Sequence, residues 1–232
     1  MSDFSRFDQR GYRVVSVREG YRDWVSTYEE TVEDLMDLAL LERISTVDWA
    51  AATRVADLGC GTGRTGAWLA GQGASALHGV DLTVEMMELA RLRGVYERLD
   101  ERDVRETGLD GGAYPLVVCC LVDEHLPEVD SLYREAGRLL LTGGRFVLVG
   151  YHPFFSMARG MPTHFDHPDG EPVAIDTHVH LPGEHVAAGL AAGLSLIEMH
   201  EGRIDDSWIE CKPKWEAMRE WPISFCQVWR KD

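Results

Sequence analysis

A glycine-rich turn between a short apolar run and a helical pattern constrains this chain more than any other feature. Residues 55–64 read Val-Ala-Asp-Leu-Gly-Cys-Gly-Thr-Gly-Arg, so Gly59, Gly61 and Gly63 follow a strand-like run and open a helix. Closely spaced glycines let the backbone turn tightly and approach a ligand, while the helix N-terminus offers free N–H groups and a partial positive charge. The pattern predicts a strand, a turn that binds a nucleotide-like ligand, and a helix.

Short apolar runs and helical patterns alternate around this turn. The apolar runs predict strands, and the amphipathic stretches between them predict helices. Nearly continuous apolar strands that alternate with helices indicate a parallel sheet with helices on both faces. The expected strands are 54–58, 76–80, 101–104, 115–122 and 145–150, and the expected helices are 63–72, 84–93 and 129–140.

The two ends of the chain depart from this alternation. Residues 20–47 carry apolar side chains at helical spacing and predict an N-terminal helical cap, in which Thr31 and Asp34 resemble a capping box. Residues 151–180 are rich in Pro, Gly and His, and Pro168-Asp-Gly170 is a turn signal between two arms. The last segment predicts one helix, 182–193, and two strands, 194–201 and 223–230, that form an antiparallel pair.

We therefore expect a single domain without a linker. Its four parts are a helical cap (1–50), a cofactor-binding core (51–150), an inserted substrate-covering segment (151–181), and a C-terminal helix with the antiparallel strand pair (182–232).

The charge balance argues against anionic partners. The chain has 23 Lys and Arg residues against 39 Asp and Glu residues, a formal net charge of −16. Such a surface repels phosphate backbones and anionic lipid headgroups on average. We expect no nucleic acid and no membrane partner.

The cysteines and the hydropathy pattern predict the cellular compartment. Five cysteines are an odd number, and the one adjacent pair, Cys119 and Cys120, lies in an apolar run, so we expect reduced, buried thiols. Residues 1–22 mix charged with apolar side chains, and no later window approaches the roughly 18 apolar residues that span a bilayer. The expected location is the cytoplasm.

Three acids near the predicted strand ends suit a nucleoside ligand. Asp81 ends the second strand, where a carboxylate accepts hydrogen bonds from both ribose hydroxyls, and Asp103 follows the third strand, where it accepts from an adenine amine. Residues 61–66 also match GxGxxG, so a nicotinamide-dependent oxidoreductase must be weighed. However, Asp57 stands two residues before the first glycine. A carboxylate there would repel the diphosphate of a dinucleotide and attract the ammonium group of another ligand.

At these residues the chain resembles the class I S-adenosylmethionine-dependent methyltransferases, whose glycine motif has the form acid-x-Gly-x-Gly-x-Gly. The resemblance implies an α/β, Rossmann-like seven-stranded sheet with an antiparallel last strand, helices on both faces, and S-adenosyl-L-methionine as cofactor. The cofactor-binding residues implied by the resemblance, including a cap residue at the cofactor entrance, are Tyr28, Asp57, Gly59, Cys60, Gly61, Thr62, Gly63, Asp81, Leu82, Met86, Asp103, Val104 and Leu121.

Candidate catalytic residues follow the fourth and fifth strands, because ligands lie across the carboxyl ends of a doubly wound sheet. Methyl transfer is an in-line displacement that needs an aligned nucleophile and, for a protonated acceptor, a base. Glu124, His125 and His152 are the candidates. The competing interpretation makes Glu124 an acceptor for backbone groups and His125 the start of a helix.

The resemblance also narrows the substrate. Methyltransferases of adenine and amide groups carry Asn/Asp-Pro-Pro-aromatic after the fourth strand, whereas this chain has Asp123-Glu-His-Leu126. We therefore expect a small-molecule acceptor. A relative that catalyses cyclisation or decarboxylation without methyl transfer, and a non-catalytic partner subunit, stay open, as do the acceptor atom and the oligomeric state.

Two clusters could add to the site. Asp176, His178 and His180 alternate, so on a strand they share one face, either as metal ligands or as part of a substrate-covering hairpin. The hairpin is the preferred interpretation, and no metal site is predicted. Aromatic residues that could line an acceptor pocket are Trp24, Tyr28, Trp208, Trp215 and Trp221. His185 and His200 are expected at the surface.

Overall fold

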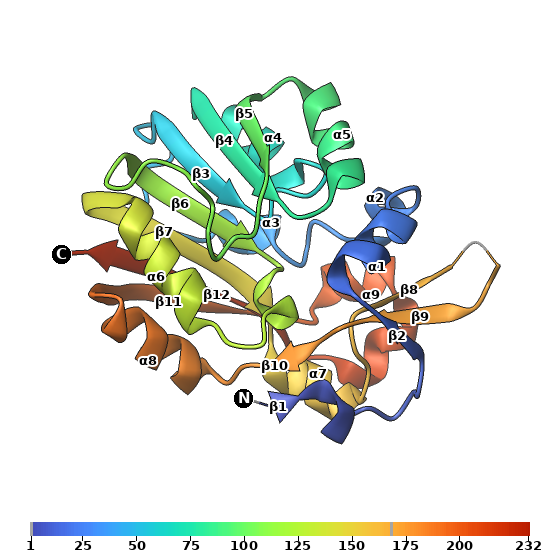
Figure 1. Cartoon of the computed structure of the whole chain (residues 1–232). Coiled ribbons are helices and arrows are strands. Elements are labelled where there is room, and N and C mark those ends of the chain that lie inside the picture. The colour runs from blue at the N-terminus through green and yellow to red at the C-terminus, as the bar shows by residue number, and fades with distance from the viewer. Residues whose placement is uncertain (1, 168) are drawn as a thin grey trace.

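A mixed seven-stranded sheet forms the centre of the protein in a computed structural model that describes residues 2–167 and 169–232 (Figure 1). Strand β12 runs antiparallel to both of its neighbours, whereas β3 to β7 run parallel. The predicted sheet with an antiparallel last strand is therefore confirmed. In spatial order its strands are β11 (Leu194–Arg203), β12 (Pro222–Lys231), β7 (Leu140–Tyr151), β6 (Tyr114–Cys120), β3 (Arg54–Leu58), β4 (Ala76–Asp81) and β5 (Tyr96–Glu101).

Helices cover the sheet on both faces, as the alternation predicts. One face packs on α6 (Asp130–Leu139) and α8 (Pro182–Ala191) through a cluster that includes Leu132, Tyr133 and Ala188. The other packs on α3 (Leu38–Leu41) and α4 (Arg64–Gly71) through Leu41 and Leu69. Helix α5 (Val84–Arg93) packs beside β4 and β5. Because β3 to β7 run parallel, their carboxyl ends lie along the same edge of the sheet.

Strand β5 lies earlier in the chain than predicted. The expected strand was 101–104, but the structure has it at 96–101. Since β5 is an edge strand, Glu97 and Arg98 point to solvent, and the segment lacks the continuous apolar run that marks the buried strands. The prediction followed the short apolar signal near Val104, which instead lies in the loop after β5 and is buried.

The N-terminal cap is helical but broken. Its helices are α1 (Val17–Trp24), α2 (Tyr28–Thr31) and α3, not one run over 20–47. The predicted capping box of Thr31 and Asp34 does not form. Instead, the Thr31 hydroxyl accepts from the Trp24 indole N–H at 3.0 Å and donates to the Thr27 carbonyl. Such bonds to the preceding turn compete with helix continuation, so α2 ends there.

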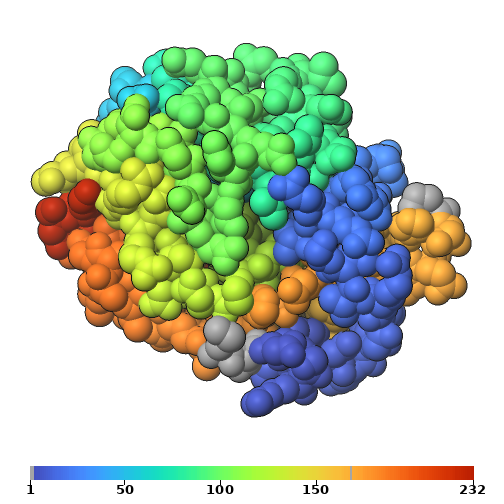
Figure 2. Space-filling model, in the orientation of Figure 1, coloured from blue at the N-terminus to red at the C-terminus, as the bar shows by residue number. Residues whose placement is uncertain are grey.

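The inserted segment forms the predicted hairpin, and the N-terminus joins it. Strands β8 (His164–Asp166) and β9 (Pro172–Ile175) pair antiparallel, although Pro168 of the predicted turn lies outside the described residues. Strand β2 (Arg13–Val15) pairs parallel with β9, and β1 (Ser2–Asp3) pairs with β10 (His178–Val179). In Figure 2 the blue N-terminal residues accordingly lie beside orange residues of the insert. The cap and the insert therefore form one layer, which sequence reasoning did not anticipate.

The remaining elements complete this layer. Helix α7 (Pro153–Arg159) follows β7, the short helix η1 (Phe4–Arg6) follows β1, and α9 (Asp206–Cys211) and η3 (Pro213–Met218) connect β11 to β12. Trp208 and Trp215 stack at 5.2 Å between ring centroids, and the Lys212 ammonium lies over both rings. Trp208 is buried in an apolar cluster with Met36 and Phe155, and the half-buried Trp215 packs against it, so neither ring lines the pocket under the N-terminal cap.

His185 is fully buried, so the prediction that it lies at the surface is wrong. Its Nδ1 lies 3.1 Å from the Tyr133 hydroxyl, and its Nε2 lies 3.4 Å from Asp123 Oδ2. Gly189, on the same helix, leaves room for the Trp229 ring, since a Cβ there would lie 2.4 Å from it. This close approach of α8 to the sheet buries the histidine.

A buried ion pair ties the cap to the core. The Arg64 guanidinium at the start of α4 bonds Asp37 at 2.9 Å and Asp34 at 2.6 Å. The side chain of Asp37 is 3% exposed, and burial raises its pKa although Arg64 opposes the shift. Asp37 also accepts from the Leu38 N–H, which begins α3.

We expect Arg64→Met to lower the free energy of unfolding by about 2 kcal/mol, because it leaves the Asp37 carboxylate buried without a cation. The figure is below that of a fully buried pair, since Asp37 keeps its bond to the helix and can take up a proton. Urea unfolding measures it, with Arg219→Met as the control, because Arg219 pairs with Asp206 and Glu216 in an exposed position. Equal losses in the two variants would contradict this view.

Within the described residues, none of the helices is long and apolar enough to cross a membrane.

Candidate functional site

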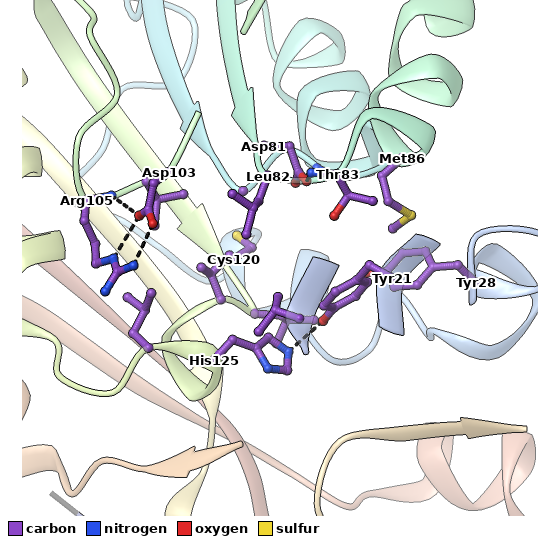
Figure 3. A pocket seen from close by; sticks show the side chains of 17 residues that line it. Tyr21, Tyr28, Asp81, Leu82, Thr83, Met86, Asp103, Arg105, Cys120 and His125 are labelled. Atoms are coloured by element: carbon purple, nitrogen blue, oxygen red, sulfur yellow. Dashed lines mark hydrogen bonds and ion pairs between the residues drawn. The ribbon is translucent and has the colours of Figure 1, made fainter. Parts of the chain in front are cut away.

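A pocket lies at the carboxyl ends of β3, β4 and β6, under the N-terminal cap (Figure 3). Its core wall comes from the glycine turn, the loop after β4 and the loop after β5. Its opposite wall comes from α1, α2 and the turn after β6. The predicted cofactor residues that line it are Tyr28, Gly59, Gly61, Asp81, Leu82, Met86, Asp103, Val104 and Leu121.

The glycine turn presents bare backbone to this pocket. Gly61 has φ +51°, and a Cβ placed there would lie 3.7 Å from the Met86 methyl group and 4.0 Å from the Gly59 carbonyl oxygen. Gly63 has φ +83° and is the N-cap of α4 in the left-handed region. Both positions need glycine for their backbone conformation. The turn therefore leaves an open backbone cradle beside a helix N-terminus.

Asp81 holds this turn in place. Its Oδ2 accepts the Gly61 N–H and its Oδ1 accepts the Thr83 N–H, both at 2.8 Å. Burial raises its pKa, whereas these two backbone bonds oppose the shift. Each carboxylate oxygen has a second lone pair, so two hydroxyl groups of a ligand can still be accepted.

Asp103 lines the pocket, but its carboxylate is already paired. Arg105 donates from Nε to Oδ1 at 2.9 Å and from NH2 to Oδ2 at 2.7 Å, and these bonds lower the pKa of Asp103. Figure 3 shows the pair at the pocket wall. Arg105 also lines the pocket and was missed by sequence reasoning. The position of Arg105, two residues after the candidate acid Asp103, could have indicated that the two side chains form an ion pair.

Asp57 does not line the pocket, contrary to the prediction that it points at the ligand. Its side chain is buried behind the glycine turn, where Oδ2 accepts from the Tyr96 hydroxyl at 2.6 Å. Burial raises the pKa of Asp57 to about 7. Cys60, Thr62 and Gly63 likewise lie outside the lining, and Cys60 and Thr62 are buried.

The cap contributes two tyrosines. Tyr28, predicted at the entrance, lines the pocket, and so does Tyr21, which was not predicted. Trp24 instead packs inward, stacked on Phe165 with 5.6 Å between ring centroids. Three-residue spacing on α1 places Tyr21 and Trp24 side by side, and spacing alone could not separate the pocket residue from the core residue.

His125 connects three segments at the pocket. Its Nδ1 lies 2.8 Å from the Asp176 carbonyl oxygen and its Nε2 lies 2.8 Å from the Tyr21 hydroxyl (Figure 3). A carbonyl can only accept, so Nδ1 carries the proton, and in the neutral ring Nε2 accepts from Tyr21. Burial lowers the pKa of His125, which favours this neutral form.

Glu124, next to His125, is buried and outside the pocket lining. Its Oε1 accepts from the Thr163 hydroxyl at 3.3 Å and lies 3.8 Å from His125 Nε2, while Oε2 has no partner among the described residues. Burial raises the pKa of Glu124 well above its ordinary value, and Asp123 adds to the shift.

The third catalytic candidate, His152, lies elsewhere. It caps α7, since its Nδ1 accepts from the Phe154 N–H at 3.2 Å, and its Nε2 lies 3.3 Å from Glu201 on β11. It does not line the pocket.

Leu121 stands at the end of β6 with φ +58°, a left-handed conformation that leucine rarely adopts. Its N–H bonds the Val149 carbonyl at 2.8 Å, which holds the residue to β7. The strained turn directs the following residues Val122 to His125 beneath the cap. Backbone strain of this kind clusters at binding sites.

The alternating acid and histidines of the insert do not act together. His178 Nε2 lies 3.8 Å from Asp176, whereas the buried His180 bonds the Leu126 carbonyl at 2.8 Å. In the part of the chain that the structure describes, no three His, Cys, Asp or Glu side chains are grouped to hold a metal ion. His200 is partly exposed and pairs with Glu198 at 2.8 Å.

Comparisons with known proteins agree with this geometry. Residues 56–148 match a family described as "Methyltransferase domain". The chain is 28% identical over 141 residues to the methyltransferase GfsG of Streptomyces halstedii, covering 57% of this chain and 50% of that protein. It is 33% identical over 104 residues to a ubiquinone biosynthesis O-methyltransferase of Xanthomonas oryzae, covering 42% of this chain and 43% of that one. The chain thus spans about half the length of these curated relatives.

Among solved structures, an S-adenosylmethionine-dependent methyltransferase from Mesorhizobium loti has a TM-score of 0.66 at 24% identity. The match covers 85% of this chain and 98% of that one, and it shows the shared fold. Its sheet order and glycine turn thus occur in a chain whose residues 56–148 match a methyltransferase domain and whose fold is shared with S-adenosylmethionine-dependent methyltransferases.

Proposed function

We propose that this protein transfers the methyl group of S-adenosyl-L-methionine to a small-molecule acceptor by in-line displacement. The observation that carries the proposal is the Asp81 carboxylate, which holds the bare glycine turn at 2.8 Å and faces the pocket. The cofactor supplies a methyl group on a positively charged sulfur.

The residues present fit this cofactor. The open cradle at Gly61 suits close approach of a ligand, and Asp81 suits a ribose diol. Leu82, Met86 and Val104 supply apolar contact for an adenine ring, and Asp103 supplies an acceptor on the same wall. The turn after β6, with Leu121, suits the methionine part. Asp57 lies behind the turn and outside the lining, so it does not itself repel a pyrophosphate, and titration with NADH separates the two cofactors.

The cap and the turn after β6 form the side of the pocket on which we place the methyl acceptor. Tyr21, Tyr28, His125 and Leu126 line the pocket opposite the glycine turn, so an acceptor placed there is covered by aromatic rings and shielded from water. If the acceptor is protonated, its proton passes to the Tyr21 hydroxyl on the pocket wall, which gives its own proton to His125 Nε2 at 2.8 Å; Glu124 Oε1 lies 3.8 Å from that nitrogen, behind the lining, and stabilises the charged ring. The position of His152 does not support a catalytic role.

We also propose that the protein works in the cytoplasm and does not bind nucleic acid. All five cysteines are free, with Cys60, Cys119 and Cys226 buried, although Cys211 is exposed against expectation. The net charge of −16 disfavours a phosphate backbone as partner.

Methyl-labelled cofactor tests the function. Incubation of the protein with trideuteromethyl S-adenosylmethionine and pools of phenols, alcohols, amines and thiols should give S-adenosylhomocysteine and one labelled small product by mass spectrometry. Asp81→Ala is the matched control and should give neither. A product formed without label and without S-adenosylhomocysteine would overturn methyl transfer in favour of cyclisation or decarboxylation.

A further inference from the structure

Tyr96, at the start of β5, lies where three glycines leave space. A Cβ on Gly66 of α4 would lie 2.1 Å from the Tyr96 hydroxyl oxygen, and one on Gly79 of β4 would lie 2.9 Å from Cε1 of the same ring. A Cβ on Gly63, the N-cap of α4, would lie 3.0 Å from Cε2. The ring therefore fills the gap between the first helix after the glycine turn and the neighbouring strand.

The hydroxyl of that ring reaches the acid of the glycine motif. It donates to Asp57 Oδ2 at 2.6 Å, at the point where β3 runs into the turn. Asp57 is 1% exposed, so this bond satisfies a carboxyl oxygen that water cannot reach. One side chain thus contacts Asp57 before the turn, the N-cap glycine of α4, and Gly66, which lies three residues further along that helix.

We propose that Tyr96 is a positioning residue for cofactor binding: its ring and hydroxyl hold the turn from Gly59 to Gly63 in the conformation in which the Gly61 N–H bonds Asp81 at the pocket wall. Tyr96 itself does not line the pocket, so it acts through the turn. On this account the third glycine of the literal GxGxxG match, Gly66, makes room for a tyrosine ring rather than for a dinucleotide. The proposal rests on the proposed cofactor.

Tyr96→Phe tests the hydroxyl, with S-adenosylhomocysteine as the titrant in calorimetry. Loss of one buried hydrogen bond to a carboxylate should raise Kd about tenfold. Tyr114→Phe is the control, because the Tyr114 hydroxyl lies 2.8 Å from His78 Nδ1, is buried at least as deeply, and lies outside the pocket lining. Both variants should lose thermal stability, but only Tyr96→Phe should lose affinity. Equal Kd values in the two variants would overturn the proposal.

Gly66→Ala tests the ring. In the wild-type background the added methyl group meets the Tyr96 ring, so Kd should rise; with Tyr96→Leu already present, the same change should leave Kd within about twofold of the single Tyr96→Leu variant. An equal effect in both backgrounds would contradict the packing argument. If Gly66→Ala does not fold, the comparison of the two phenylalanine variants still decides. A wild-type protein that binds no S-adenosylhomocysteine would refute the proposed cofactor, whereas wild-type binding with an unchanged Tyr96→Phe variant would refute the role of Tyr96 alone.

Discussion

Asp81→Ala should weaken the binding of S-adenosylhomocysteine by at least about 100-fold. The substitution removes the acceptor for two ribose hydroxyl groups, and hydrogen bonds to a charged group contribute about 1.5 to 3 kcal/mol each. It also releases the Gly61 and Thr83 N–H groups, each now held at 2.8 Å, so the glycine turn loses its anchor. Calorimetric titration measures the change.

Two variants control for this effect. Asp81→Asn keeps the size of the side chain and one acceptor oxygen, so its loss should be smaller, about tenfold. Glu101→Ala removes an acid that pairs with Asp81 in the β4–β5 register but bonds exposed Arg18 and lies outside the pocket lining. It should bind like wild type. Wild-type affinity in Asp81→Ala would remove Asp81 from the cofactor site.

Glu124→Gln should lower turnover by about 100-fold or more once an acceptor is known, with the Kd for S-adenosylhomocysteine nearly unchanged, because a positioned base contributes 10²- to 10⁴-fold. The glutamine keeps the bond from Thr163 but carries no negative charge to stabilise the protonated ring of His125, the base of this pair. Burial raises the pKa of Glu124, so the wild-type rate should increase with pH beyond the ordinary range of a glutamate.

The pH profile separates this role from a structural one. In Glu124→Gln the turnover rate should no longer increase with pH, or should increase only with the deprotonation of His125, whose pKa is lowered by burial. His125→Ala should reduce turnover too, since it also removes the partner of Tyr21. Full activity in both variants would exclude the pair from the mechanism.

The raised pKa of Glu124 also affects stability. Folded protein holds the Glu124 proton more tightly than unfolded protein, so this contribution to stability is lost as pH rises through the folded pKa.

The pocket wall that carries the glycine turn and Asp81 could be predicted from sequence because its geometry is local. A strand, a glycine turn and a helix follow one another within residues 54–71, and the acid at the end of the next strand lies beside them in any parallel sheet. The antiparallel last strand was predictable for the same reason, as two strand-like runs follow the last helix.

The cap side could not be predicted in the same way, because its contacts join segments far apart in the chain. The bond between Tyr21 and His125 spans 104 positions, and β2 pairs with β9 of the insert. Nothing in the spacing of Tyr21 marks it as a pocket residue. The prediction for Asp57 was wrong for a different reason. Its carboxyl is bonded by Tyr96 behind the turn, and Tyr96 belongs to the edge strand β5, which lies earlier in the chain than expected.

The most direct test of this account is a calorimetric titration of the purified, metal-stripped protein with S-adenosylhomocysteine, S-adenosylmethionine and NADH side by side. We predict micromolar or tighter binding of both adenosyl ligands, abolished or strongly weakened in Asp81→Ala, and no binding of NADH. Binding of NADH alone would contradict the methyltransferase assignment of the pocket, and binding of none of the three would contradict its role as a cofactor site.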